Sequence, residues 1–572
     1  MRGRTIRICV LLVIGLFVAM FFLAEEPGTD IDEGSTLVLE VGGSYVEAAQ
    51  APWLSRALGE TSPPFVGLLS LFDRAEMDSR LEVVVVVIRP LAIGWGKVGE
   101  LRQALERLSA AGHRTVAYLD MASFSGSREY FLATGADEIW VVPAGIVPLL
   151  GLAAEYYFLG GLWEKLGIEF DVAKAGRYKS AVEAYTSTGM SESSREMANS
   201  LLDSINDFFL SGIALGRNVS VGAIRAAIDQ GPISPVDLEG LGLVDSVGHL
   251  DDLLDRIGGT VVDHEVYAQV DPAALGFDPV ARVALVYGTG TVVSTAGSRS
   301  GRAGSVFAAD RFDLALNQAA QDPSVDAIIV RIDSPGGSAM ASEEIWRSID
   351  GAREEGKPII ASFSDLAASG GYYAAAAADE IVANDATLTG SIGVFTLRPV
   401  YGGGLAKLGV SVETLTRGEY ADFILSSEPL SPGAKKRLQS MVLQIYELFV
   451  RRVAEGRDMG LEEVDRVGQG RVWTGSQAYE IGLVDHLGGL HTALDRVRDH
   501  LDLPPGEDLE LVVFPAPRTL SEELADILDA KIEGVVAARW PMPNALRGLG
   551  SWLAGLEMEG PLVVPPYLIE IR

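Results

Sequence analysis

The sequence predicts an α/β protein of two tandem homologous domains, built from repeated β-β-α units, behind one N-terminal transmembrane helix. Three observations lead to this prediction: an uncharged apolar run close to the N-terminus, apolar strand-like runs that alternate with amphipathic stretches, and a long-period internal repeat. A chain of 572 residues is also longer than one hydrophobic core normally serves, so we expect at least two domains.

The overall charge excludes one large class of partner. With 46 Lys and Arg residues against 78 Asp and Glu residues, the formal net charge is −32. Nucleic-acid binding needs clustered basic side chains that neutralise phosphates, so we expect no nucleic-acid partner. The single cysteine, Cys9, falls within the N-terminal apolar run, so the rest of the chain has no thiol for an internal disulfide or a cysteine-based metal cluster.

The N-terminal apolar run extends from Ile8 to Ala24, after three arginines and before a cluster of acidic residues. Its length lies at the short end of what a membrane span requires, and no small-residue cleavage site follows it. Basic residues before a span stay in the cytoplasm, which places the rest of the chain on the extracytoplasmic side. We therefore interpret residues 1–34 as a cytoplasmic tip, an uncleaved signal anchor and a linker. A cleaved signal peptide is the alternative.

Residues 35–270 form the predicted N-terminal domain. Strands are expected at Leu37–Val41, Val83–Ile88 and Thr115–Leu119, with an amphipathic helix over Gly99–Ala111. The second strand reads V-V-V-V-V-I, which is the continuous apolar run of a strand buried on both faces of a parallel sheet.

Residues 271–506 form the predicted C-terminal domain and repeat the same order of elements. A glycine-rich stretch, Gly288–Gly304, is interpreted as a mobile loop. The last segment, 507–572, is treated as a C-terminal extension whose role the sequence does not specify. The expected elements of this domain are strands at Val283–Tyr287, Ala327–Ile332 and Pro358–Phe363 and a helix at Ser342–Arg353.

Short sequence matches indicate that the two halves are a duplication. The tetrapeptide A-D-E-I occurs at Ala136–Ile139 and again at Ala378–Ile381, a shift of 378 − 136 = 242. The tetrapeptide G-L-V-D occurs at Gly242–Asp245 and at Gly482–Asp485, a shift of 482 − 242 = 240. Matches in nearly one register over more than a hundred residues indicate a duplicated domain.

Ser369 is the candidate nucleophile. Two glycines follow it, which allow another backbone to approach closely, and an alanine-rich stretch then predicts a helix through Ala374–Ala378. Taken alone, this pattern is also typical of a buried serine at the start of a core helix. The repeat places Ser369 opposite Ser127, where Arg128 and Glu129 replace the two glycines, so the second half is favoured as the site.

Lys179 is the candidate base. It lies in the first half, in A-G-R-Y-K-S-A-V-E, and its repeat counterpart in the second half is Ala421. A buried lysine can accept a serine proton at neutral pH because desolvation lowers its pKa. A solvated surface lysine and a Ser-His-Asp triad stay open as alternatives. The six histidines, none of which lies in a glycine-rich loop, are His113, His249, His264, His486, His491 and His500.

Backbone amides of a glycine turn are the candidate oxyanion donors. The segment Asp333–Ser338 directly follows an expected strand, at the carboxyl end where α/β folds bind ligands. We expect the N–H of Gly336 or Gly337, together with that of Gly370, to stabilise an oxyanion. An ordinary turn is the alternative interpretation of Pro-Gly-Gly.

Taken together, these motifs resemble a known family. Asp333-Ser-Pro-Gly-Gly, Ala367-Ala-Ser-Gly-Gly-Tyr-Tyr, Thr389-Gly-Ser-Ile-Gly-Val and the first half's G-R-Y-K-S-A-V-E resemble signal peptide peptidase A, or protease IV, in its long, duplicated, membrane-anchored form. The resemblance implies two domains of the ClpP/crotonase superfamily. It also implies that Ser369 is the nucleophile, that Lys179 is the general base, and that Ser391 orients the lysine.

The same resemblance implies a function and a setting. The expected activity is that of a serine endopeptidase that cleaves apolar, extended peptides such as signal-peptide remnants, with neither metal nor cofactor. The expected setting is the extracytoplasmic side of a bacterial cytoplasmic membrane, in a homotetramer. A crotonase-type acyl-CoA hydrolase or isomerase and a non-catalytic membrane scaffold are the alternatives.

Overall fold

The computed structural model describes residues 31–47, 63–295, 306–515 and 562–563. Among these residues, no helix is both long enough and apolar enough to cross a membrane. The predicted signal anchor, Ile8–Ala24, lies outside the described residues and stays a prediction.

The first half forms a parallel sheet of six strands in the order β6-β4-β3-β2-β1-β7. The valine-rich run lies in β2, whose residues 83–88 are all buried, as the sequence predicts for a strand covered on both faces. The elements of this sheet and of its first helical layer are β1 (Ser35–Gly43), α3 (Phe65–Met77), β2 (Leu81–Leu91), α4 (Trp95–Ala110), β3 (Arg114–Leu119), α5 (Ser127–Ala133), β4 (Glu138–Val141), β6 (Ser246–Val247) and β7 (Val261–Asp263).

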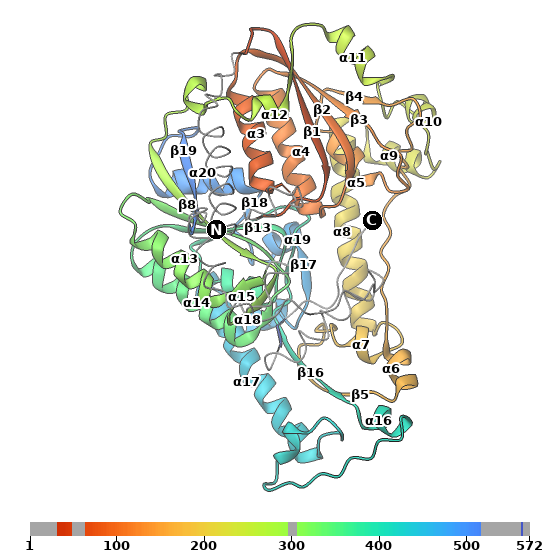
Figure 1. Ribbon diagram of the computed structural model, residues 1–572, viewed down its shortest axis with the longest axis vertical. Helices are drawn as coiled ribbons and strands as arrows, with labels where there is room; N and C mark the ends of the chain where they lie inside the picture. Colours follow the sequence, from red (N-terminus) through yellow and green to blue (C-terminus); the bar gives the residue numbers. More distant parts are fainter. Residues whose placement is uncertain (1–30, 48–62, 296–305, 516–561, 564–572) are drawn as a thin grey trace, which may run out of the picture.

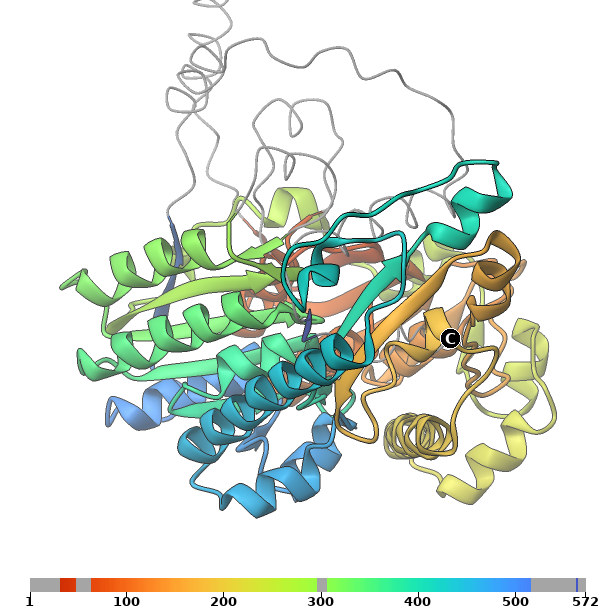
Figure 2. The ribbon, with the colours of Figure 1, turned by 90° about the horizontal axis from the view of Figure 1, so that it is seen from below.

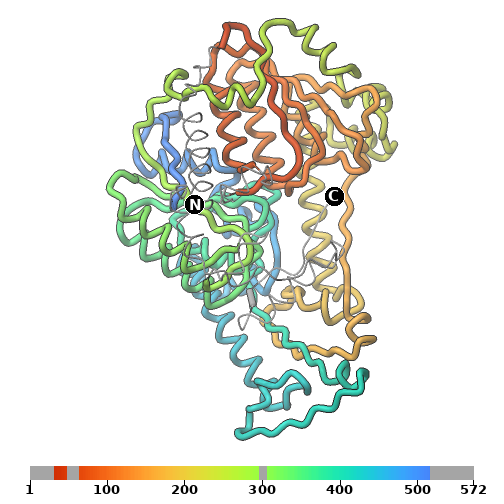
Figure 3. Tube along the Cα trace, in the orientation of Figure 1, coloured from red at the N-terminus to blue at the C-terminus, as the bar shows by residue number. Residues whose placement is uncertain are grey.

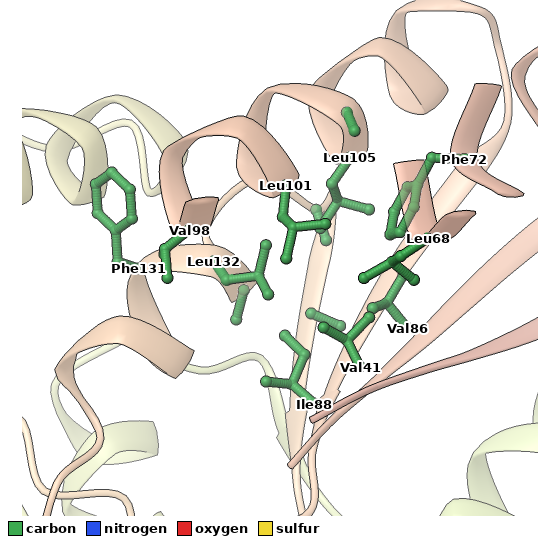
Figure 4. Packing of buried hydrophobic residues seen from close by; sticks show 14 of the residues in the cluster. Val41, Leu68, Phe72, Val86, Ile88, Val98, Leu101, Leu105, Phe131 and Leu132 are labelled. Atoms are coloured by element: carbon green, nitrogen blue, oxygen red, sulfur yellow. The ribbon is translucent and has the colours of Figure 1, made fainter. Parts of the chain in front are cut away.

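Helices α3 and α4 cover one face of this sheet (Figures 1 and 4). Figure 4 shows Leu101 and Leu105 of α4 next to Val86 and Ile88 of β2, and all four side chains are fully buried. The same hydrophobic cluster includes Ile329 in the second half, so the two halves share one core.

The second half forms a larger sheet with the order β17-β15-β13-β11-β8-β19, and β14 pairs with both β13 and β18. The edge strand β19 lies within the predicted C-terminal extension. The bounds are β8 (Ala281–Thr289), α13 (Ala309–Gln321), β11 (Ala327–Ser334), α14 (Ala339–Glu354), β13 (Ile359–Ala368), α15 (Gly370–Ala375), β14 (Glu380–Ala383), β15 (Leu388–Gly390), β17 (Val472–Thr474), α19 (Gly475–Glu480), β18 (His486–Leu487), α20 (Leu490–His500) and β19 (Leu509–Phe514).

A third sheet joins the halves, in the order β10-β9-β12-β20-β16-β5. Strand β5 of the first half runs antiparallel to β16 of the second half, from Glu169 opposite Val400 to Ala175 opposite Val394. The two strands lie side by side in all three views of the whole chain (Figures 1, 2 and 3). The bounds are β5 (Glu169–Ala175), β9 (Thr291–Val293), β10 (Val306–Ala308), β12 (Gly337–Ser338), β16 (Val394–Val400) and β20 (Leu562–Val563).

Equivalent tertiary contacts confirm the duplication. The Tyr130 hydroxyl donates to the Leu243 carbonyl at 2.6 Å, and the Tyr372 hydroxyl donates to the Leu483 carbonyl at 2.8 Å. These pairs follow the shifts found in the sequence. The remaining elements are α6 (Gly160–Leu166), α7 (Glu183–Thr186), α8 (Glu192–Gly216), α9 (Val221–Ile228), α10 (Pro235–Gly240), α11 (Leu250–Ile257), α12 (His264–Tyr267), η1 (Pro272–Leu275), α16 (Gly402–Lys407), η2 (Ala421–Ile424), α17 (Pro432–Arg457) and α18 (Leu461–Val467).

Two local predictions need correction. The helix after Ser369 ends at Ala375, so the prediction of a helix through Ala378 extends too far. The start of Gly288–Gly304 is strand rather than loop, because β8 continues to Thr289 and β9 pairs with β10 and β12. Partners distant in the sequence therefore override the glycine content of this stretch.

Candidate active site

The structure brings Lys179 and Ser369 together across the two halves. The Lys179 Nζ lies 2.7 Å from the Ser369 Oγ, although 190 residues separate them in the sequence. Both residues are fully buried. The lysine is therefore not the solvated surface side chain that its local sequence also allowed.

Lys179 reaches this position because its loop packs on the second half. Strand β5 ends at Ala175, and the Tyr178 N–H then donates to the Gln469 carbonyl at 2.8 Å. A Cβ on Gly470 would lie 2.5 Å from the Lys179 backbone nitrogen, so only glycine fits there. The sequence analysis missed this contact between Gly470 and the Lys179 backbone, although the G-Q-G-R run at 468–471 is a signal for close backbone approach.

Ser391 also contacts the lysine. The Lys179 Nζ lies 2.9 Å from the Ser391 carbonyl oxygen and 3.0 Å from its Oγ. Ser391 has a φ of +54°, a conformation that is uncommon for a residue with a side chain, and its N–H donates to the Arg471 carbonyl at 2.7 Å. This backbone turns both oxygens of Ser391 toward the amine.

Burial lowers the pKa of Lys179 well below its ordinary value of 10.5. Desolvation disfavours the charged ammonium form, and the hydrogen-bond partners of Nζ are uncharged oxygens. In its neutral form such an amine has a free lone pair, which is what a general base for a serine hydroxyl requires.

The backbone of Ser369 is held in a strained conformation. Its φ is +56° and its ψ is −113°, and it precedes the first residue of α15. Its N–H donates to the Gly390 carbonyl at 2.8 Å. Non-glycine residues with positive φ persist only where surrounding contacts hold them, and they concentrate at functional sites.

The candidate oxyanion glycines also lie together. A Cβ on Gly370 would lie 2.5 Å from the Ser342 Oγ and 3.1 Å from the Gly337 nitrogen. The Gly336 N–H donates to the Ser334 Oγ at 3.1 Å, and Gly337 belongs to the short strand β12. The α15 start and the Pro-Gly-Gly segment therefore touch, and a side chain at position 370 would push them apart.

The histidine contacts in the described residues involve groups other than Ser369 and Lys179. Both ring nitrogens of His113 bond to backbone carbonyls, and His486 lies beside Glu380. Among the residues that the structure describes, no group of three or more His, Cys, Asp or Glu side chains is arranged to hold a metal ion. The described site thus offers a hydroxyl, an amine and backbone amides, a set suited to acyl transfer.

Comparisons with known proteins agree with this chemistry. The family model described as peptidase family S49 matches residues 107–260 and 351–504. The chain is 33% identical to serine protease SPPA, chloroplastic, of Arabidopsis thaliana over 91% of this chain and 77% of that protein. It is 32% identical to protease 4 of Haemophilus influenzae over 69% of this chain and 66% of that protein. Among solved structures, ClpP1 from Listeria monocytogenes covers 36% of this chain and 90% of its own, with 15% identity and a TM-score of 0.22.

Proposed function

The chain belongs to peptidase family S49, that of signal peptide peptidase A, and is a serine protease; we propose that it is an endopeptidase with a Ser-Lys dyad. Ser369 is the nucleophile and Lys179 is the general base in this proposal. The observation that carries it is the 2.7 Å separation of the Ser369 Oγ and the Lys179 Nζ, both buried. Family membership argues against an acyl-CoA enzyme and against a scaffold.

The proposed reaction has two acyl-transfer steps. The Ser369 Oγ attacks the scissile carbonyl carbon while its proton passes to the neutral Lys179 amine. The resulting ammonium gives that proton to the leaving amine, so the peptide bond breaks and an acyl-enzyme ester forms. Water then attacks the ester, Lys179 takes its proton, and the serine oxygen leaves with a proton returned by the lysine. Ser391 holds the amine toward Ser369 through both steps.

The Gly337 and Gly370 amides are the proposed donors to the tetrahedral oxyanion. The Gly336 amide already bonds to Ser334, whereas Gly370 begins a helix and has no intrahelical acceptor. The Val292 N–H of β9 donates to the Gly336 carbonyl. The N–H of Gly337 in the same peptide group therefore points away from β9. Donors placed in advance stabilise developing charge at little reorganisation cost.

An extended peptide is the proposed form of the substrate. Strand β20 pairs antiparallel with β12 and also with β16, with Val563 opposite Gly337 and Leu562 opposite Phe395. Strand β20 thus takes the position between β12 and β16, which indicates that this position suits a peptide in extended conformation beside Gly337. Apolar sequences such as signal-peptide remnants are the proposed substrates.

The proposed setting is a homotetramer anchored in a bacterial cytoplasmic membrane, with both halves on the extracytoplasmic side. The apolar run at Ile8–Ala24 after three arginines supports the anchor and its orientation. We expect the mature protein to keep its N-terminus and to stay with membranes after a high-salt wash. A mature N-terminus close to Glu25 and a soluble protein would contradict the anchor.

A serine-directed fluorophosphonate tests the dyad directly. The purified chain is incubated with the reagent, and labelled peptides are identified by mass spectrometry alongside cleavage of an extended apolar peptide. We expect one label, on Ser369, and loss of labelling in Lys179→Met, because the hydroxyl then lacks its base. If labelling of another serine increases in parallel with the loss of peptidase activity, the assignment of Ser369 as the nucleophile is refuted.

A further inference from the structure

A cluster of buried charges lies where the first half meets the catalytic strands of the second half. We call it the interface cluster, and its charged members come from both halves. Arg331 of β11 is fully buried, and its guanidinium lies 2.7 Å from Glu100 and 3.1 Å from Glu47. The members are Glu47, Lys97 and Glu100 of the first half and Arg331, Asp333 and Asp365 of the second half.

Lys97 is the first-half member that pairs with both strands leading to the catalytic turns. Its Nζ lies 2.5 Å from the Asp333 Oδ2 and 3.1 Å from the Asp365 Oδ2, and the residue is only 3% exposed. Asp333 stands three residues before Gly336, and Asp365 stands four residues before Ser369. One ammonium of the first half therefore binds both strands that carry the catalytic groups.

A bulge in β13 creates this arrangement. Strands β11 and β13 pair evenly up to Ile332 opposite Phe363, but the next pair is Ser334 opposite Ala367. An advance of two residues along β11 therefore matches an advance of four residues along β13. Asp365 is one of the residues in this bulge. Bulges of this kind bend a strand and redirect side chains, and they are common next to active sites.

The start of α4 also binds this bulge. The Asp365 carboxylate accepts hydrogen bonds from the Gly94 N–H at 2.9 Å and from the Lys97 N–H at 2.8 Å. A Cβ on Gly96 would lie 2.6 Å from the Ser364 carbonyl oxygen, so the helix touches the bulged backbone itself. The first half thus contacts β13 through backbone and side chain at one place.

Charge explains why Lys97 is required there. Asp333 and Asp365 share this ammonium with Glu47, which Arg331 also pairs, and the two aspartates repel each other once the ammonium is removed. Burial raises the pKa of Asp333 to about 6, although the positive charge of Lys97 acts to lower it. The carboxylates around Lys97 raise the pKa of its ammonium group. Without Lys97 this pair of carboxyl groups must take up a proton or move apart, and either change alters the contacts that join the two strand ends.

We propose that Lys97 is a positioning residue that holds the ends of β11 and β13 at the separation where the oxyanion amides face the carbonyl attacked by Ser369. The proposal rests on the proposed dyad and extends it. The first half then supplies two residues to the site: the proposed base, Lys179, from the loop after β5, and the positioning residue, Lys97, from α4. Lys97 acts through Asp333 and Asp365 and does not touch the reacting atoms.

Substitution of Lys97 tests the proposal in the full-length chain. We expect Lys97→Met to lower kcat for an extended peptide by about 10- to 100-fold with little change in KM, because displaced amides weaken transition-state binding. The double variant Lys97→Met/Asp333→Asn removes one of the two facing carboxylate charges, and with it their mutual repulsion, and is expected to recover most of kcat. If Lys97→Met does not fold, Asp365→Asn leaves the lysine bound to Asp333 and is expected to lower kcat about threefold.

Arg217→Met provides the matched control. Arg217 forms an ion pair with Asp245 in the first half and is also largely buried, with its side chain 11% exposed. We expect this variant to lower the thermal unfolding temperature and leave kcat unchanged. Three outcomes would each overturn the positioning role. The first is an equal loss of kcat in folded Lys97→Met and folded Arg217→Met, and the second is wild-type kcat in folded Lys97→Met or in Asp365→Asn. The third is no recovery of kcat in the double variant.

The same series separates this inference from the proposed function. Ser369→Ala is measured beside the other variants. An inactive Ser369→Ala with wild-type kcat in Lys97→Met overturns only the role of Lys97. An active Ser369→Ala overturns the dyad, and with it the basis of the inference.

Discussion

Ser127 and Ser369 are counterparts in the repeat, yet their backbones differ. Ser369 precedes α15 with a φ of +56°, whereas Ser127 is already the first residue of α5. The Ser127 Oγ donates to the Gly151 carbonyl at 3.2 Å, and the Ser369 Oγ lies against the amine of Lys179. The same position in a duplicated fold thus holds an internally bonded hydroxyl in one half and a hydroxyl hydrogen-bonded to a buried lysine amine in the other.

The residues after each serine explain part of this difference. Gly370 has no room for a Cβ, whereas the first half carries Arg128, whose guanidinium donates to the Ile93 carbonyl. Glu129 follows, and its carboxylate accepts from the Leu91 N–H at 2.7 Å. After Ser127, side chains therefore fill the space that backbone amides line after Ser369.

The lysine shows the opposite asymmetry. Lys179 follows β5 and is buried, whereas its counterpart Ala421 begins the short η2 helix and is only partly buried. The proposed dyad therefore divides its serine and its lysine between the two halves of the duplication. Five predictions test this division, from the largest expected effect to the smallest.

Removal of the two serines gives the largest contrast. We expect Ser369→Ala to lower kcat at least ~10³-fold, because the nucleophile is lost while a small, buried position is conserved in shape. Ser127→Ala is expected to stay within about twofold of wild type, because its hydroxyl bonds only within the first half. Peptide cleavage and circular dichroism of both variants give the comparison. Comparable losses in the two variants would contradict a single site in the second half.

Replacement of the lysine is expected to have nearly as large an effect. Lys179→Arg keeps a positive charge, but a guanidinium does not deprotonate at any working pH, so kcat should fall about 10³-fold, as in Lys179→Ala. Lys174→Arg, five residues earlier on β5, serves as the control and should resemble wild type. Substantial cleavage by Lys179→Arg would reopen the search among the histidines.

The pH dependence of the wild-type enzyme tests the same base. Only the neutral amine accepts a proton, so kcat/KM should rise with pH as Lys179 deprotonates. Because burial lowers its pKa well below 10.5, this rise should be complete below the range in which a free lysine titrates. A rate that keeps rising through that range would contradict a desolvated base.

Exchange of the glycine environment should have an intermediate effect. Gly370→Ala places a Cβ against Ser342 and the Gly337 backbone, so we expect kcat to fall about 10- to 100-fold with KM nearly unchanged. Arg128→Gly makes the first half more like the second and should create no activity in a Ser369→Ala background. Initial rates over a range of substrate concentrations separate kcat from KM. A large rise in KM alone would place Gly370 in substrate binding instead.

Ser391 is expected to give the smallest effect. Ser391→Ala removes the Oγ that lies 3.0 Å from the Lys179 Nζ but leaves the backbone carbonyl at 2.9 Å. One lost hydrogen bond corresponds to a fall in kcat/KM of about 3- to 10-fold. The counterpart in the first half, Leu149, has no hydroxyl, and Leu149→Ala should change stability rather than activity. A loss as large as that of Lys179→Ala would give Ser391 a direct role in proton transfer.

The sequence alone predicted much of the fold. The valine run of β2, the matching tetrapeptides and the glycine turns depend on local composition and spacing, and these predicted the parallel strands and the duplication. Ser369 and Lys179 could be selected because each lies in a short, recognisable motif. The boundaries of the two domains and the roles of the site residues stay predictions.

The tertiary structure decided how these pieces meet. The pairing of β5 with β16 brings a lysine to a serine 190 residues away, and no local pattern encodes such a partner. Lys97 escaped the sequence analysis for the same reason, whereas the close approach at Gly470 had a local signal in the G-Q-G-R run. A glycine that admits another backbone, or a lysine that neutralises two buried carboxylates, owes its role to neighbours from the other half. Close packing and desolvation act between residues that are adjacent only in the folded chain, so the chemistry of this site exists only after the two halves are joined.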